Sequence, residues 1–136
     1  MGNGEKELRV TGCGLQALYS TISILVMFAL LGCGHPIPKL EGMDLTEWKN
    51  DKNGCNGLRQ KMTELVIKQK DKLLSLTETD IISLLGKPDE TELYKRNEKF
   101  YKYYFSNGPG CAGSASRKSI TLRFNAMGLL KEAVVD

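Results

Sequence analysis

The spacing of apolar residues divides the chain into an N-terminal apolar segment and a longer mixed segment. No charged side chain occurs between Gly12 and Gly34, whereas charges recur every few residues after His35. The stretch "GHPIPKLEG" that follows the apolar segment is rich in Pro and Gly, as is typical of an extended linker. We therefore predict three parts: a terminal segment over residues 1–32, a tether over 33–43 and a single domain over 44–136.

Helical spacing dominates the first half of the predicted domain. Residues 58–73 form an amphipathic pattern of about four turns, with lysines opposite the apolar side. Its apolar positions are Leu58, Met62, Leu65, Val66 and Leu73. A shorter helix is predicted over 78–85, because Thr77 and Asp80 have capping-box spacing and Gly86 and Pro88 stop the helix. An earlier helical turn is expected to be capped by Asp44 or Thr46.

Alternating apolar and polar residues dominate the second half and indicate strands. The predicted strands are Thr91–Arg96, Lys99–Phe105, 119–125 and Leu129–Val135. Helices followed by consecutive strands predict an α+β fold, with the N-terminal helices packed on one face of a three- or four-stranded antiparallel sheet. Four carboxylates flank the second helix, and we interpret them as capping residues at its start and exit: Asp80, Asp89, Glu90 and Glu92.

The apolar segment ends in a motif that bears on localisation. A secretory signal has an apolar stretch of about 7–15 residues, and a spanning helix about 20, so the length of 15–31 fits either. The sequence Leu30-Leu31-Gly32-Cys33 resembles the bacterial lipobox, which implies cleavage after Gly32 and a lipid anchor on Cys33. Gly34 resembles the residue found there in lipoproteins released to the outer membrane, so we expect a cell-envelope location. An uncleaved anchor and cleavage without lipid are the alternatives.

The lipobox interpretation limits how the remaining cysteines can pair. Removal of the signal takes Cys13 away, and the lipid occupies Cys33, so Cys55 and Cys111 can pair in only one way in an oxidising compartment. Closing that loop is worth on the order of 4 kcal/mol by the chain-entropy estimate. Two free buried thiols are the alternative. No metal site is predicted, because there is no CxxC motif and the only histidine, His35, lies in the tether.

Two stretches of the predicted domain resemble a known family. The phrase "LTETDIISLLGKPDE", then an aromatic strand, then "ITLRFNAMGLLKEAVV", is similar to the SmpA/OmlA (BamE-like) lipoproteins over about residues 77–136. The matching positions are Thr77, Asp80, Ile81, Leu84, Leu85, Gly86, Pro88, Leu122, Phe124, Asn125, Gly128 and Leu130. The resemblance implies a non-catalytic outer-membrane scaffold or accessory protein-binding subunit, with a role in membrane assembly or integrity. An exported, inhibitor-like binding module on the same scaffold is the alternative.

The residues themselves argue against most catalytic and nucleic-acid functions. Gly108, Gly110 and Gly113 satisfy GxGxxG, but a strand follows where a dinucleotide site needs a helix, so no cofactor is expected. The nearby serines, including Ser114 and Ser116, have no histidine to activate them. The net charge is only +3 and the lysines are interspersed with acids, so no nucleic-acid partner is expected.

The aromatic run "KFYKYYF" supplies the candidate contact surface. A strand covered on one face exposes the other, so we predict that Tyr101, Lys102 and Tyr103, with Trp48, contact an envelope protein. The alternative is that the segment around Trp48 simply covers the tyrosines.

Overall fold

The part of the chain that the structure describes contains one sheet of four antiparallel strands. Their order in the sheet, β1-β2-β3-β4, is the same as their order in the chain. In this computed structural model residues 36–113 and 116–136 are described, so the predicted signal peptide, Cys33 and Ser114 lie outside the described residues. The strands are β1 (Glu90–Leu93), β2 (Lys99–Ser106), β3 (Lys118–Phe124) and β4 (Leu130–Val135). The helices are α2 (Leu45–Asn50), α3 (Leu58–Gln69) and α4 (Glu78–Leu85). Short 3-10 turns are η1 (Lys52–Gly54), η2 (Lys70–Leu73) and η3 (Lys95–Asn97).

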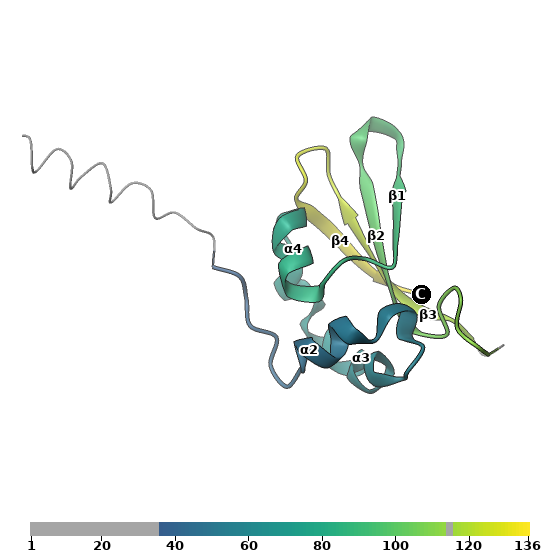
Figure 1. The fold of residues 1–136 in the computed structure, drawn as a ribbon. Coiled ribbons are helices and arrows are strands. Elements are labelled where there is room, and N and C mark those ends of the chain that lie inside the picture. The colour runs from purple at the N-terminus through teal and green to yellow at the C-terminus, as the bar shows by residue number, and fades with distance from the viewer. Residues whose placement is uncertain (1–35, 114–115) are drawn as a thin grey trace, which may run out of the picture. The chain divides into compact units, whose positions relative to one another are not determined.

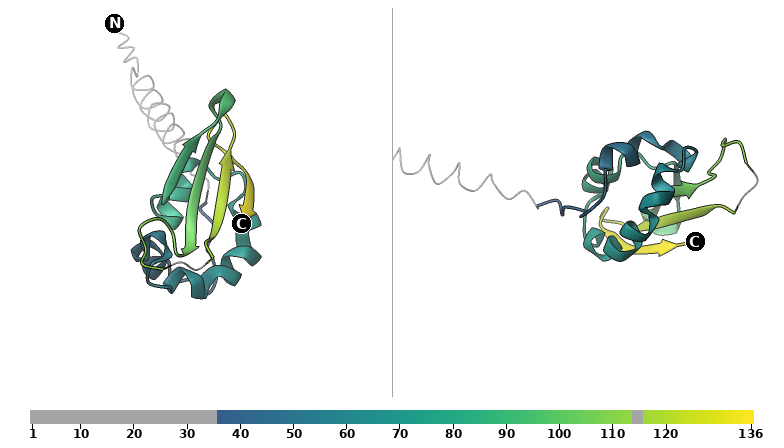
Figure 2. Two further views of the ribbon diagram at one scale, coloured as in Figure 1. Left: turned by 90° about the vertical axis from the view of Figure 1, so that its right-hand side faces the viewer. Right: turned by 90° about the horizontal axis from the view of Figure 1, so that it is seen from below.

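The helices precede the sheet in the chain and cover one of its faces, as Figures 1 and 2 show. The predicted α+β fold is therefore confirmed. Residues Ile37–Asp136 form one compact unit, so part of the predicted tether belongs to the domain. Leu40 is buried in the core, and the backbone N–H of Glu41 donates to the side chain of Gln69 at 2.8 Å. The predicted boundary at residue 44 is thus several residues too late.

Local capping explains where two of the helices begin. The Asp44 carboxylate accepts from the amides of Thr46 and Glu47, at 2.9 and 3.0 Å, and starts α2. The capping box predicted for α4 is present: Thr77 Oγ1 accepts from the Asp80 amide at 3.2 Å, and the Thr77 amide donates to the Asp80 carboxylate at 3.0 Å. Gly86, with φ 83°, ends α4 as expected.

Two elements differ from the predicted pattern. The long helix predicted over 58–73 leaves α-helical geometry after Gln69 and finishes as the 3-10 turn η2. The first predicted strand is shorter than expected, because β1 ends at Leu93 and η3 turns the chain back. In that turn Arg96 and Asn97 both have positive φ, 64° and 60°. Two consecutive left-handed residues allow the chain to reverse within this short loop, and alternation alone does not reveal them.

The core lies between the inner face of the sheet and the three helices. Register places Tyr101 opposite Leu122 and Tyr103 opposite Ile120, and all four are buried on that face. The helical layer contributes Trp48, Met62, Val66, Leu73, Ile81, Leu84 and Leu85. Because aromatic and aliphatic side chains from both layers meet there, burial of this apolar area is the main stabilising contribution.

Candidate functional site

The residues predicted to contact a partner are buried instead of exposed. Trp48 and Tyr103 have 0% of their surface exposed and Tyr101 has 6%. The Trp48 ring packs against those of Tyr103 and Phe105, with centroid distances of 6.5 and 5.9 Å. The prediction of an outward tyrosine surface is therefore wrong: the alternative, cover by the segment around Trp48, describes Tyr103, whereas Tyr101 packs against Phe124. Lys102 lies between Tyr101 and Tyr103 in β2, so its side chain is on the opposite face of the sheet, where it is half-exposed.

The polar ends of these buried aromatic rings all bond to α4 or its ends. Trp48 Nε1 donates to the Leu85 carbonyl at 3.1 Å, and the Tyr103 hydroxyl donates to the Gly86 carbonyl at 2.8 Å. The Tyr101 hydroxyl donates to the Glu78 carboxylate at 2.7 Å. A hydrogen bond to the polar atom of a buried ring offsets the cost of removing that atom from water. The aromatic cluster thus fixes α4 on the sheet.

Tyr101 and Glu78 also influence each other's protonation. Burial, followed by the bond to the Glu78 carboxylate, raises the pKa of Tyr101 to about 12. Burial acts to raise the pKa of Glu78, but hydrogen bonds from Tyr101 and Lys99 and the charge of Lys99 outweigh it, so that pKa is lowered. Lys99 Nζ lies 3.0 Å from the Glu78 carboxylate. Glu78 is therefore held as a carboxylate near neutral pH.

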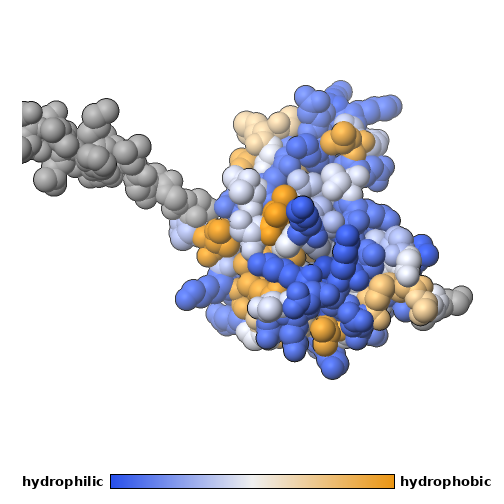
Figure 3. Space-filling view, viewed as in Figure 1, coloured by the Kyte–Doolittle hydropathy of each residue, from blue (hydrophilic) through white to orange (hydrophobic). Residues whose placement is uncertain are grey.

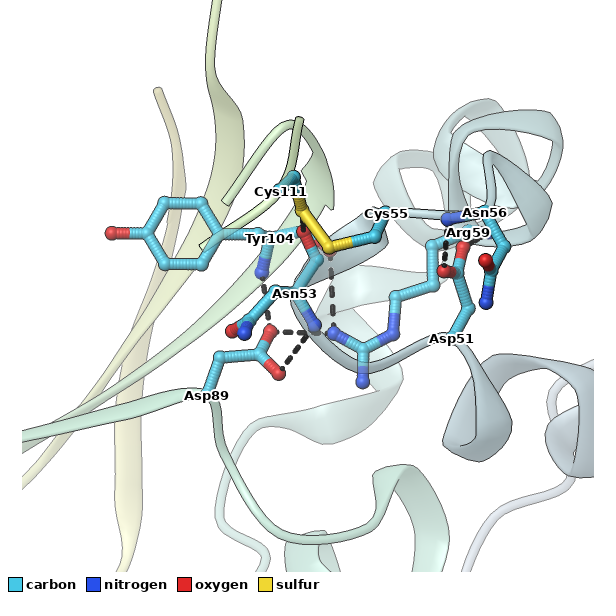
Figure 4. The surroundings of a disulfide bond; sticks show 8 residues. All are labelled: Asp51, Asn53, Cys55, Asn56, Arg59, Asp89, Tyr104 and Cys111. Carbon is cyan, nitrogen blue, oxygen red and sulfur yellow. Dashed lines mark hydrogen bonds and ion pairs between the residues drawn. A yellow bond between two sulfur atoms is a disulfide. The ribbon is translucent and has the colours of Figure 1, made fainter. Parts of the chain in front are cut away.

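The predicted Cys55–Cys111 disulfide is present and connects two loops that are far apart in sequence. It links the turn after η1 to the loop between β2 and β3 (Figure 4). The same loops are joined by the Gly108 amide, which donates to the Asn53 carbonyl at 2.8 Å. A Cβ atom on Gly108 would lie 2.6 Å from that carbonyl oxygen, so only glycine fits. The glycine-rich loop uses this amide and its close approach to η1 for internal contacts.

A buried ion pair lies beside the disulfide. Arg59, from the first turn of α3, has its guanidinium 2.5 Å from the Asp89 carboxylate, and their side chains are 2% and 0% exposed. Arg59 Nε also donates to the Trp48 carbonyl at 2.8 Å, and the guanidinium stacks on the Trp48 ring at 4.9 Å. Asp89 further accepts from the amides of Asn53 and Tyr104, at 3.0 and 2.8 Å. The pair therefore connects η1, α3 and β2 beside the disulfide (Figure 4).

A second buried carboxylate supports the start of α3. Asp51 is fully buried and accepts from the amides of Asn56 and Arg59, both at 2.8 Å. The residue before the helix, Gly57, has no side chain to cap it, so Asp51 supplies the acceptor from the preceding loop.

Asp89 was interpreted from sequence as a helix-exit residue, and that interpretation is wrong. Arg59 was missed although it lies three residues before Met62 and seven before Val66, on the buried stripe of α3. A charged side chain on a buried stripe needs a partner of opposite charge. The position of Arg59 on that stripe therefore could have indicated a buried ion pair. Nothing in the sequence distinguishes Asp51 from Asp89 as that partner.

The face of the sheet away from the helices carries mixed polar residues. Arg123 bonds Glu98, with the closest approach 2.8 Å, and this bond and the charge of Glu98 raise the pKa of Arg123. Tyr104 also belongs to this face but is only 6% exposed, with Gly108 of the β2–β3 loop close to its ring. In the view of Figure 3 the described surface is mainly hydrophilic, with small separate apolar groups.

The described residues contain neither a metal-binding group of side chains nor a membrane-spanning helix. Among residues 36–113 and 116–136, no three His, Cys, Asp or Glu side chains are grouped so that they could hold a metal ion. Within the same ranges no helix combines the length and apolar character needed to cross a bilayer. No family model matches the chain, and no curated protein shows significant sequence similarity to it.

Proposed function

We propose that this protein is a lipid-anchored, non-catalytic component of a bacterial cell envelope, which serves as a scaffold or accessory protein-binding subunit. The observation that carries the proposal is Leu30-Leu31-Gly32-Cys33 at the end of an uncharged stretch that starts at Gly12. A thiol at the membrane surface, flanked by small residues, suits both acylation of Cys33 and cleavage before it. Several acyl chains on one residue suffice for stable membrane attachment.

The disulfide in the domain supports an exported location. Structural disulfides persist in oxidising compartments and are rare in the reducing cytosol. Cys55 and Cys111 are paired with each other, which leaves Cys33 available for lipid. The same location agrees with the resemblance of residues 77–136 to BamE-like outer-membrane lipoproteins.

The buried charged side chains bond to other groups of the same chain, which supports a non-catalytic role. The buried carboxylates Asp51 and Asp89 are both occupied by donors of the chain itself, and the buried Arg59 is shared among the same elements. The glycine-rich loop is engaged with η1 and the disulfide. These groups stabilise the fold, and an anchored domain of this kind acts by binding.

Metabolic labelling in a bacterial host tests the anchor. Cells that express the full chain are grown with an alkyne analogue of palmitate, and labelled protein is detected after membrane fractionation. We expect label on the wild type and on Cys13→Ala, and none on Cys33→Ala, which should also lose membrane attachment or accumulate uncleaved. Equal labelling of Cys33→Ala and the wild type would overturn the proposal.

A further inference from the structure

The outer edge of β4 has backbone groups without a strand partner among the described residues. Ser119 and Asp136 exchange both backbone hydrogen bonds, at 3.2 and 2.9 Å. In an antiparallel pair, hydrogen-bonded and non-bonded residue pairs alternate. Val135 opposite Ile120 and Ala133 opposite Leu122 are therefore non-bonded pairs, whose N–H and C=O groups point away from β3. β4 is the last strand of the sheet, as Figure 2 (left) shows, so these groups have no neighbouring strand among the described residues.

A groove of about 490 Å³ runs beside this edge. Its other wall is formed by the end of α3, the turn η2 and the residue after that turn, and it includes the apolar side chains of Ile67 and Leu74. These two side chains are 39% and 40% exposed. A free edge flanked by an apolar wall is the arrangement in which proteins bind an extended segment by adding a strand: main-chain bonds give affinity and alternate side chains fill the groove.

Lys70 indicates the chemistry of the segment that fits. Its ammonium group donates to the outward carbonyl of Ala133 at 3.1 Å. An added strand would bring its own N–H to that carbonyl, and the ammonium would then need another acceptor. A carboxylate on the arriving segment supplies one. The groove also carries Lys131, Asp71 and Glu132, but of its charged residues Lys70 is the one that bonds the edge.

A second copy of this chain fits less well. Two-fold pairing of β4 with another β4, centred on Ala133, would bring a second Lys70 toward the first, and the like charges would repel. We propose that the β4 edge and its groove bind an extended segment of a partner protein, with apolar residues at alternate positions and one acidic residue opposite Ala133. The inference rests on the proposed protein-binding role and identifies its surface.

A labelled peptide tests this with the full chain in detergent micelles. The probe is an acetylated hexapeptide, Thr-Val-Thr-Asp-Thr-Val, with fluorescein at its end, followed by fluorescence polarisation. The side chains at its even positions face the helical layer, and the N–H groups of those residues face β4. N-methylation of the Asp residue should weaken binding about tenfold or more, whereas N-methylation of the neighbouring Thr should change it less than about twofold.

Variants of the protein test where on the surface the peptide binds. Leu74→Asp should weaken binding about tenfold, whereas Leu93→Asp, at a 73% exposed position on the β1–β2 hairpin, should leave it unchanged. Lys70→Met should weaken the Asp peptide but not its Asp→Ala analogue. Amide hydrogen exchange at Ala133 and Val135 should slow when the peptide is bound.

Three results would overturn the inference: no saturable binding below about 1 mM, equal loss with both N-methylated peptides, or a dimer of the free chain that Lys70→Met strengthens. The last result would mean that Lys70 merely protects the edge from self-association. Peptide binding does not depend on a lipid at Cys33. The binding assay can therefore fail while palmitate labelling succeeds, and labelling can fail while the peptide binds.

Discussion

The two ends of the sheet are held by different kinds of interaction. At the end that meets α2 and α3, a disulfide and the fully buried Arg59–Asp89 pair join η1, α3 and β2. At the β1–β2 hairpin end, seen at the top of Figure 1, the Lys99–Glu78 pair is partly solvated, with 39% and 23% of the side chains exposed. Leu93 at that end is 73% exposed. We therefore expect single substitutions to destabilise the first end more than the second.

The largest effect is expected from breaking the buried pair. Asp89→Ala leaves the Arg59 guanidinium buried without its carboxylate and should lower the free energy of unfolding by about 3–5 kcal/mol. Urea denaturation followed by circular dichroism measures it. The double variant Arg59→Met with Asp89→Leu should be less destabilised than Asp89→Ala, because no buried charge remains. A double variant that is destabilised as much as Asp89→Ala, or more, would contradict this account of the pair.

Loss of the disulfide should rank second. Cys55→Ser or Cys111→Ser should lower the free energy of unfolding by about 2–4 kcal/mol, mainly because the unfolded chain gains freedom. Both single variants and the double variant should have the same stability, and a reductant should bring the wild type to that level. A wild type that migrates identically on reducing and non-reducing gels and matches the variants in stability would exclude the bond.

Glu78 tests the other end and its pH dependence. Its pKa is lowered in the folded state, so its contribution to stability is fully present above the ordinary value of 4.5 and is lost as the pH falls through the lowered pKa. Glu78→Gln should cost about 1 kcal/mol or less at pH 7 because the pair is partly solvated. Urea titrations from pH 7 to pH 3 should show the two proteins converging in acid. A gap that widens in acid would contradict the assigned direction.

The smallest effect is expected at the exposed hairpin. Leu93→Ser removes a side chain that is 73% exposed and should change the free energy of unfolding by about 0.5 kcal/mol or less. A loss comparable with that of Asp89→Ala would remove the contrast between the two ends.

Prediction from sequence succeeded where the determinants are local. The capping box and the glycine stop of α4 lie within the ten residues from Thr77 to Gly86, and the helix spans Glu78–Leu85 as expected. The alternation of β3 likewise identified its buried residues, Ile120, Leu122 and Phe124. In both cases residues close together in the sequence determine the local structure.

The pattern could not determine which face of β2 is buried. Aromatic residues occupy both parities of "KFYKYYF", and Lys99 and Lys102 have opposite parity, so charge does not distinguish the faces. Tyr103 faces inward, where α2 places Trp48 against its ring. That placement depends on contacts between residues more than fifty positions apart. The Arg59–Asp89 pair, thirty residues apart, was missed for the same reason.

The account depends most on the fate of Cys33, and intact-mass analysis of the protein from bacterial membranes tests it directly. We predict a chain that begins at Cys33 and carries a thioether-linked diacylglycerol and an amide-linked acyl chain, with the mass of one disulfide between Cys55 and Cys111. Retention of Met1, or an unmodified Cys33, would contradict the lipoprotein proposal and the envelope location built on it.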